Sequence, residues 1–191
     1  MKSRVDQIVT FYQESQKLCK ASLTDGSNQK PKYSLRTLTR ALEYSEKICS
    51  LYGLERSLYE GFSMSFLTQL NAQSIPIMEK LIRTHIVKNL TKSQLKTLPN
   101  LSEQLKSKNV KFEHFWIEIG DKDPTRPEDY IKTNTVRKQL RSLARVVLSR
   151  KYPVLLQGPT SSGKTSMYIF IILFFKFINF DFNLIFNFIL F

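Results

Sequence analysis

Near the end of the chain, an apolar run leads into glycines, hydroxyls and a lysine at the spacing of a phosphate-binding loop. Residues 153–165 read PVLLQGPTSSGKT, which contains the pattern G-x-x-x-x-G-K-T. Glycines let such a loop curl tightly, so that backbone N–H groups surround a phosphate without a side chain in the way. The lysine supplies a cation for the β- and γ-phosphates, and the threonine hydroxyl can ligate Mg²⁺. We therefore predict a site for ATP and Mg²⁺ formed by Gly158, Pro159, Thr160, Ser161, Ser162, Gly163, Lys164, Thr165 and Ser166.

The residues around this motif favour a phosphate site and also limit what the site can do. The apolar run 154–156 is typical of a buried strand, and a helix is expected to begin at Gly163. The positive end of that helix's dipole would face the phosphates. Only 26 residues, 166–191, follow Thr165, whereas a nucleotidase core needs several further strands, one of them carrying a carboxylate. We expect the first part of an ATP site and no complete catalytic centre.

The composition is basic, with a formal net charge of +13. This balance favours an acidic partner such as RNA, DNA or an acidic protein, although the cations are scattered among acidic residues and an ordinary basic protein is the alternative.

Cys19 and Cys49 lack metal-ligand spacing and are expected to be reduced thiols. The first residues contain no apolar segment, so no secretory signal is predicted.

Apolar residues at helical spacing predict an all-helical unit in residues 1–90. The helices are expected at 4–20, from the N-cap Ser34 to the stop at Gly53, at 57–70, and at 75–90 with Ser74 as N-cap and Pro76 in the first turn. Gly61 inside the third helix predicts close packing. The expected buried faces consist of Val5, Ile8, Val9, Tyr12 and Leu18 or Cys19; Leu35, Leu38, Leu42, Ser45 and Ile48; Leu58, Phe62, Phe66 and Leu70; and Ile77, Leu81, Ile82 and Ile86.

Two arginines and two histidines are the remaining candidates for chemistry. Arg36 and Arg40 lie in the first turns of the second predicted helix, where cations oppose the helix dipole. A site that needs a guanidinium group near an anion would explain them, but two solvated arginines are the simpler interpretation of the residues alone. His85 and His114 have no catalytic or metal-binding neighbour in the sequence, so both are interpreted as structural.

Residues 91–150 are predicted to connect two parts of the protein. Residues 91–110 are polar and rich in lysine, as in a linker or mobile loop, and 111–119 alternate as in a strand. An amphipathic helix follows, with the apolar stripe Val136, Leu140, Leu143, Ala144, Val147 and Leu148 and a polar face containing Arg137, Lys138, Arg141, Arg145 and Arg150.

The composition changes abruptly in the tail, residues 167–191, which is dominated by Phe, Ile, Leu and Asn. A membrane anchor is one interpretation, but Lys176 and Asp181 would each cost about 2.5–3.5 kcal/mol in mid-span. The residues are largely those encoded by codons rich in A and T. We therefore favour read-through into non-coding sequence as the origin of the tail.

Four segments in order resemble the midasin family: residues 33–42 (YSLRTLTRAL), 56–62 (RSLYEGF), 66–70 (FLTQL) and 152–166 (YPVLLQGPTSSGKTS). Midasins are dynein-related AAA+ ATPases with six tandem AAA modules, which remodel pre-60S ribosomal particles. The resemblance covers about residues 4–166 and stops at the tail.

The resemblance implies a mainly α chain: the helical lid of one AAA+ module, followed by the first strand and P-loop of the next, incomplete α/β core. Residues 1–90 would be the lid, 91–150 a connection with a short strand or hairpin and a helix, and 151–166 the start of the core with its Walker A loop. Arg36 resembles the sensor 2 arginine of the family. The resemblance therefore favours a functional role for Arg36 over that of a solvated residue, whereas the role of Arg40 stays open. Walker B, sensor 1 and arginine-finger residues have no counterpart here, so no ATP hydrolysis is expected from this chain.

The partners implied by the resemblance are pre-60S particles, their assembly factors and the rest of the AAA+ ring, in the nucleus and nucleolus. No membrane contact is expected. The alternatives are a basic helical module that binds RNA or assembly factors and, less favoured, a tail-anchored membrane protein.

Overall fold

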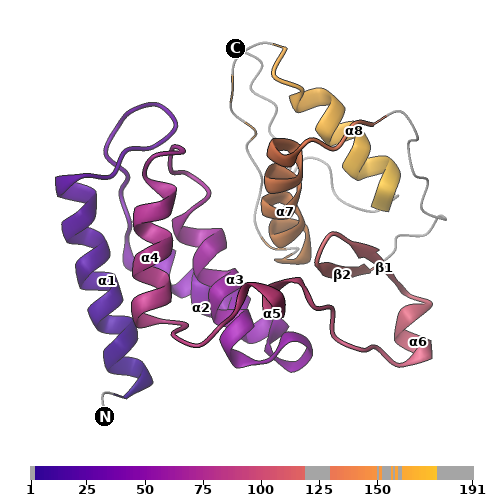
Figure 1. The fold of residues 1–191 in the computed structure, drawn as a ribbon, viewed down its shortest axis with the longest axis horizontal. Coiled ribbons are helices and arrows are strands. Elements are labelled where there is room, and N and C mark those ends of the chain that lie inside the picture. The colour runs from indigo at the N-terminus through magenta and orange to yellow at the C-terminus, as the bar shows by residue number, and fades with distance from the viewer. Residues whose placement is uncertain are drawn as a thin grey trace. The chain divides into compact units, whose positions relative to one another are not determined.

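Helices dominate the chain, as the sequence predicts, and a two-stranded sheet is added to them (Figure 1). The computed structural model describes residues 3–118, 130–149, 151, 156, 158 and 161–175. Its contacts divide the chain into two units, Met1–Pro99 and Asn100–Phe191, each of which is described by itself. The predicted strand residues 154 and 155, the loop residues Pro159 and Thr160, Arg150, and the tail beyond Phe175 lie outside the described residues.

The first unit contains the four predicted helices, but the first is one residue longer than predicted, the third ends at Phe66 and not at residue 70, and the fourth is shorter. Its elements are α1 (Arg4–Ala21), α2 (Leu35–Tyr52), α3 (Leu54–Phe66), α4 (Ile75–His85) and the short α5 (Lys92–Lys96). In Figure 1, α1 lies beside α4, and α2 packs against α3. The third helix begins three residues early because Gly53, at φ 75°, ends α2 and at once starts α3. α4 ends at His85 and not at residue 90, and the expected 91–110 loop contains α5 and α6 (Glu103–Lys106).

Three phenylalanines form the centre of this unit. Phe11 meets Phe62 and Phe66 edge-on, each with ring centroids 5.0 Å apart, and Phe62 stacks on Phe66 at 5.7 Å. All three side chains are fully buried. Tyr33 tilts onto Phe66 and its hydroxyl donates to the Phe66 carbonyl oxygen at 2.5 Å. Edge-on aromatic pairs stabilise a core beyond their buried area, by about 0.5–1.5 kcal/mol each.

In three helices, some residues that were predicted to be buried are exposed, and neighbouring residues of the same helix are buried in their place. Val5 and Val9 of α1 are exposed and Phe11 and Ser15 are buried in their place, whereas Cys19 is buried, as one of the two predicted alternatives. In α2, Leu35 and Leu42 are exposed and Ala41 and Tyr44 are buried in their place, whereas Ser45 and Ile48 are buried as predicted. In α4 the exposed Ile77 is replaced by the buried Met78. Each helix carries more apolar residues than one face can bury, so the shape of its neighbour selects the stripe.

Gly61 confirms the predicted close packing, because α3 touches α2 at this residue. A methyl group at Gly61 would lie closer than 3.0 Å to the Ser45 hydroxyl and to the Ala41 carbonyl oxygen. Ala41 and Ser45 are both buried, and the Ser45 hydroxyl donates to the Ala41 carbonyl at 2.7 Å. Three small residues thus let the two helix backbones approach.

Ser74 occupies the N-cap position of α4, as predicted, but its side chain makes no capping hydrogen bond to the helix. Its hydroxyl accepts from the Thr24 N–H at 2.9 Å, and Asn71 donates to the Thr24 hydroxyl at 2.6 Å. These polar contacts attach the turn at residues 24–28 to the segment before α4. Pro76 lies in the first turn of α4, as predicted.

Arg56 is a buried cation, which no local pattern in the sequence indicates. It is 5% exposed, packs over the Tyr52 ring at 4.6 Å, and donates to the Thr97 carbonyl oxygen. Glu60, 3% exposed, lies one turn further along α3, with 4.0 Å between the charged groups. Arg56 therefore attaches the end of the first unit to α3.

In the second unit, the predicted strand is a hairpin of β1 (Asn109–Phe112) and β2 (Phe115–Glu118), with Phe112 opposite Phe115. Glu113, at φ 50°, and His114 form the two-residue turn, so His114 is not the strand residue that was predicted.

α7 (Asn134–Ser149) confirms the predicted helix and buries Leu140, Leu143, Ala144 and Val147 beside β2. In α8 (Lys164–Phe175), Phe170 stacks on Tyr130 at 4.4 Å. Within the described residues, no helix is long and apolar enough to cross a membrane.

Replacing Gly61 by alanine should destabilise the first unit, although alanine is the better helix former by about 1 kcal/mol. The new methyl group would push α3 away from α2, an overpacking that typically costs about 1–3 kcal/mol. Urea denaturation followed by circular dichroism measures the difference. Gly26→Ala is the matched control, because open space surrounds Gly26. A Gly61→Ala variant as stable as the control would contradict the close approach.

Burial of Cys19 predicts a loss of stability at alkaline pH. Cys19 is 7% exposed, and burial raises the pKa of its thiol to about 11; burial also raises the pKa of Tyr33. The thiol is neutral when protonated, so a pKa that is higher in the folded than in the unfolded protein stabilises the fold below pH 9. This contribution to the free energy of unfolding disappears as the pH rises through 11. For the thiol it amounts to about 2–3 kcal/mol.

Urea midpoints at pH 8 and pH 11 measure this effect, and Cys19→Ala should reduce the difference between them. Ser15→Ala, at another buried position of α1, is the control that should keep the wild-type difference. If both variants lose stability between pH 8 and pH 11 as the wild type does, the thiol is not the cause.

Candidate nucleotide-binding site

The described part of the predicted phosphate loop contains a glycine whose backbone conformation other residues rarely adopt. Gly163 has φ 81° and Ser161 has φ 63°, both in the left-handed region. Open space surrounds Gly163, so it is the backbone conformation and not crowding that requires glycine there. α8 begins at the next residue, and its first helical hydrogen bond runs from the Met167 N–H to the Gly163 carbonyl at 2.9 Å. The predicted helix start is therefore correct to one residue.

Lys164 lies across the loop that precedes it. Its Nζ donates to the Gly158 carbonyl oxygen at 2.8 Å and lies 3.4 Å from the Ser162 hydroxyl. The side chain is half-buried. A primary ammonium group has three donors, so it can exchange these oxygens for those of a phosphate without leaving the loop. The side chain of Lys164 thus lies against Gly158 and Ser162 of the predicted loop.

The first turn of α8 offers further groups to an anion. Thr165 and Ser166 are exposed, and the first N–H groups of any helix lack partners inside the helix. Together with the helix dipole, such groups attract phosphates. The Thr165 hydroxyl is a suitable single ligand for Mg²⁺, with the other ligands coming from phosphates and water. The described residues of the loop therefore fit a magnesium-bound polyphosphate.

The stretch of chain that contains the loop carries positive charge without carboxylates. Residues 130–175 contain no Asp or Glu. Nor do the described ranges bring three or more His, Cys, Asp or Glu side chains together as a metal site would require. A carboxylate that positions water or completes the Mg²⁺ shell therefore does not come from the described part of this loop's surroundings.

Arg36 and the loop belong to different units of the chain. Arg36 is exposed in the first turn of α2. This turn is fixed by the Ser34 N–H, which donates to the Thr37 hydroxyl at 3.2 Å. Arg40, one turn further along, is also exposed. The exposure of Arg36 at a helix start suits an interaction with an anion outside the first unit.

The two histidines have structural positions. His85 Nε2 lies 2.9 Å from the Glu14 carboxylate, which joins α4 to α1. His114 is half-buried in the hairpin turn. Sequence reasoning foresaw neither the Glu14 contact nor the buried Arg56, because these pairs join residues that are 71 and 41 positions apart. No local pattern in the sequence indicates such contacts.

Comparisons with known proteins support the resemblance that the four sequence segments indicate. A family model described as the midasin AAA lid domain matches residues 1–89, the stretch that contains α1 to α4. The chain is 45% identical to midasin from Dictyostelium discoideum over 172 residues, 85% of this chain. It is 29% identical to midasin from Giardia intestinalis over 163 residues, 76% of this chain. In both cases it spans about 3% of the relative's length. The chain therefore belongs to the midasin family, and its first 89 residues match the AAA lid domain of that family.

Proposed function

We propose that this chain contributes two parts of an ATP-driven AAA+ machine: a lid in residues 1–89 and a phosphate-binding loop in residues 158–166. The single observation that carries the second part is Lys164, held against the Gly158 carbonyl at 2.8 Å directly after the left-handed Gly163. The lid match supports the first part.

In this proposal the loop binds and orients the β- and γ-phosphates of ATP. The N–H groups at the start of α8 and the Lys164 ammonium hold the phosphate oxygens, and the Thr165 hydroxyl contributes one ligand to the metal. Bound Mg²⁺ supplies charge neutralisation at the phosphates. None of the loop residues is a general base or a water-positioning carboxylate. We therefore assign binding and no hydrolysis to this chain.

Lys164→Ala should weaken the binding of Mg²⁺-ATP by this chain, which we expect to be weak already. A charge-assisted hydrogen bond contributes about 1.5–3 kcal/mol, so the affinity should fall about tenfold or more. Fluorescence anisotropy of a labelled ATP analogue measures it, with phosphate release followed in parallel. Lys80→Ala, which removes an exposed lysine of α4, is the control.

Equal binding by the wild type and Lys164→Ala would rule out the loop as the phosphate site. Phosphate release by the wild type that Lys164→Ala abolishes would show a complete catalytic centre and contradict the assignment of binding alone.

We further propose that Arg36 acts as the sensor 2 arginine of the lid and reaches the γ-phosphate of that lid's own module. The wider role would be ATP-driven remodelling of pre-60S particles and removal of assembly factors in the nucleus and nucleolus. The exposure of Arg36 and the lid match support this role, and the family resemblance supplies the partners.

Arg36→Ala separates this role from a structural one. In the 191-residue chain it should leave the melting temperature unchanged or slightly higher, because a cation at a helix start opposes the dipole by about 0.3–1 kcal/mol. In a full-length midasin that carries the same change, ATP turnover and the release of factors from pre-60S particles should both slow. A melting temperature lowered by several degrees, or unchanged turnover, would contradict the sensor assignment.

A further inference from the structure

The second unit carries a concentration of positive charge that the nucleotide loop does not use. Residues 130–175 contain eight Lys or Arg and no Asp or Glu. Elsewhere the two signs are mixed: residues 1–99 contain 15 Lys or Arg with 8 Asp or Glu, and residues 100–129 contain 5 Lys or Arg with 7 Asp or Glu. Seven of the eight cations precede the loop: Lys132, Arg137, Lys138, Arg141, Arg145, Arg150 and Lys151.

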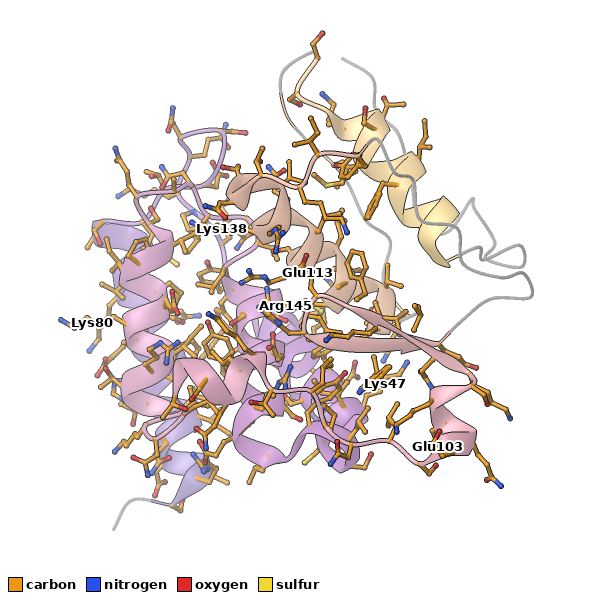
Figure 2. The ribbon with its side chains drawn as sticks, turned by 45° about the vertical axis from the view of Figure 1, so that its right-hand side comes forward. Lys47, Lys80, Glu103, Glu113, Lys138 and Arg145 are labelled. Carbon is orange, nitrogen blue, oxygen red and sulfur yellow. The ribbon has the colours of Figure 1, made fainter. Side chains whose placement is uncertain are left out.

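On α7 these cations share one side of the helix. At 3.6 residues per turn, Arg137, Lys138, Arg141 and Arg145 fall within an arc of about 100°. The arc lies beside the buried stripe of Leu140, Leu143, Ala144 and Val147 and does not overlap it. Figure 2 shows Lys138 and Arg145 projecting from α7. We call these four cations the basic stripe; it is about 12 Å long, at 1.5 Å per residue.

Glu113 offsets part of the charge of the basic stripe, and the Arg137 Nε donates to the Lys132 carbonyl oxygen at 3.4 Å. Glu113, at the hairpin turn, faces Arg141 at 3.7 Å and is 10% exposed on its side chain. Glu103 pairs with Lys106 at 2.7 Å. Arg137 and Lys138 are exposed at the N-terminal end of α7, where cations oppose the dipole and do not stabilise the helix. A charge arrangement that is unfavourable for the helix alone indicates an external anion.

We propose that the basic stripe binds the phosphate backbone of single-stranded RNA. Arg137 and Lys138, the two exposed cations of the stripe, would meet the phosphates first. The half-buried Arg141 and Arg145 lie one and two turns further along the same side of α7. Guanidinium groups bind phosphates through two parallel hydrogen bonds. Asn134 and Ser142 border the stripe and can bond a ribose 2′-hydroxyl, which deoxyribose lacks. This site is separate from the ATP loop and does not depend on it.

The test uses the full 191-residue chain and a fluorescein-labelled oligouridylate of 12 nucleotides. The double variant Arg137→Gln/Lys138→Gln should bind about tenfold more weakly at low salt, by the magnitude of charge-assisted hydrogen bonds. The slope of log K against log[salt] should become shallower by about 1.4, which corresponds to two lost phosphate contacts on a single strand. Fluorescence anisotropy measures both quantities.

Lys17→Gln/Lys20→Gln is the matched control, because it removes the same charge from two exposed lysines of α1. It should retain most of the wild-type affinity, as should Lys164→Ala, and the α7 variant should still bind Mg²⁺-ATP as the wild type does. RNA binding and nucleotide binding can thus fail independently. Circular dichroism melting curves confirm that both double variants remain folded.

Several results would overturn the proposal. An equal loss of affinity in the two double variants would mean that only the net charge matters. Equally tight binding of oligodeoxythymidylate of the same length would remove the preference for RNA. Competition by polyglutamate at equal charge concentration would assign the basic stripe to an acidic protein instead, and the absence of measurable oligouridylate binding at 50 mM salt would exclude the site.

Discussion

The first unit depends on the contact between α2 and α3 at Gly61. The absence of a side chain there lets α3 lie against the Ala41 carbonyl and the Ser45 hydroxyl. This approach sets the rotation of α3, so that Phe62 and Phe66 turn toward Phe11 of α1. Packing in such an interior is dense, and a displacement at one contact is transmitted to its neighbours.

The position of Arg36 follows from the same core. The Tyr33 hydroxyl donates to the Phe66 carbonyl oxygen at 2.5 Å, and the Tyr33 carbonyl oxygen accepts from the Tyr12 hydroxyl at 3.4 Å. Both contacts fix the chain directly before Ser34, where α2 begins. An exposed arginine is thereby attached to a rigid base, which a residue that senses a phosphate requires. The chemistry proposed for Arg36 thus rests on a tyrosine that never meets the ligand.

In the second unit, a glycine conformation and the positive charge of residues 130–175 act beside the small apolar core of α7 and β2. The left-handed Gly163 turns the chain into α8, and Lys164 then folds back onto Gly158. Because residues 130–175 contain no carboxylate, their field favours anions both at the loop and along α7. The phosphate loop and the basic stripe are two separate uses of that field.

The sequence by itself determined the helical class of the chain, the first unit's four helices, the close approach at Gly61 and the helix start after Gly163. These follow from periodicity and from glycine stereochemistry, which are local properties. The phosphate-binding role of the loop and the sensor role of Arg36 stay predictions. Only the tertiary structure decided that Phe11 and Met78 are buried in place of Val5, Val9 and Ile77, which of the two alternatives, strand or hairpin, residues 109–118 adopt, and that Arg56 holds the Thr97 carbonyl. Each of these choices depends on the shape and polar groups of a neighbour distant in the chain, which no local pattern encodes.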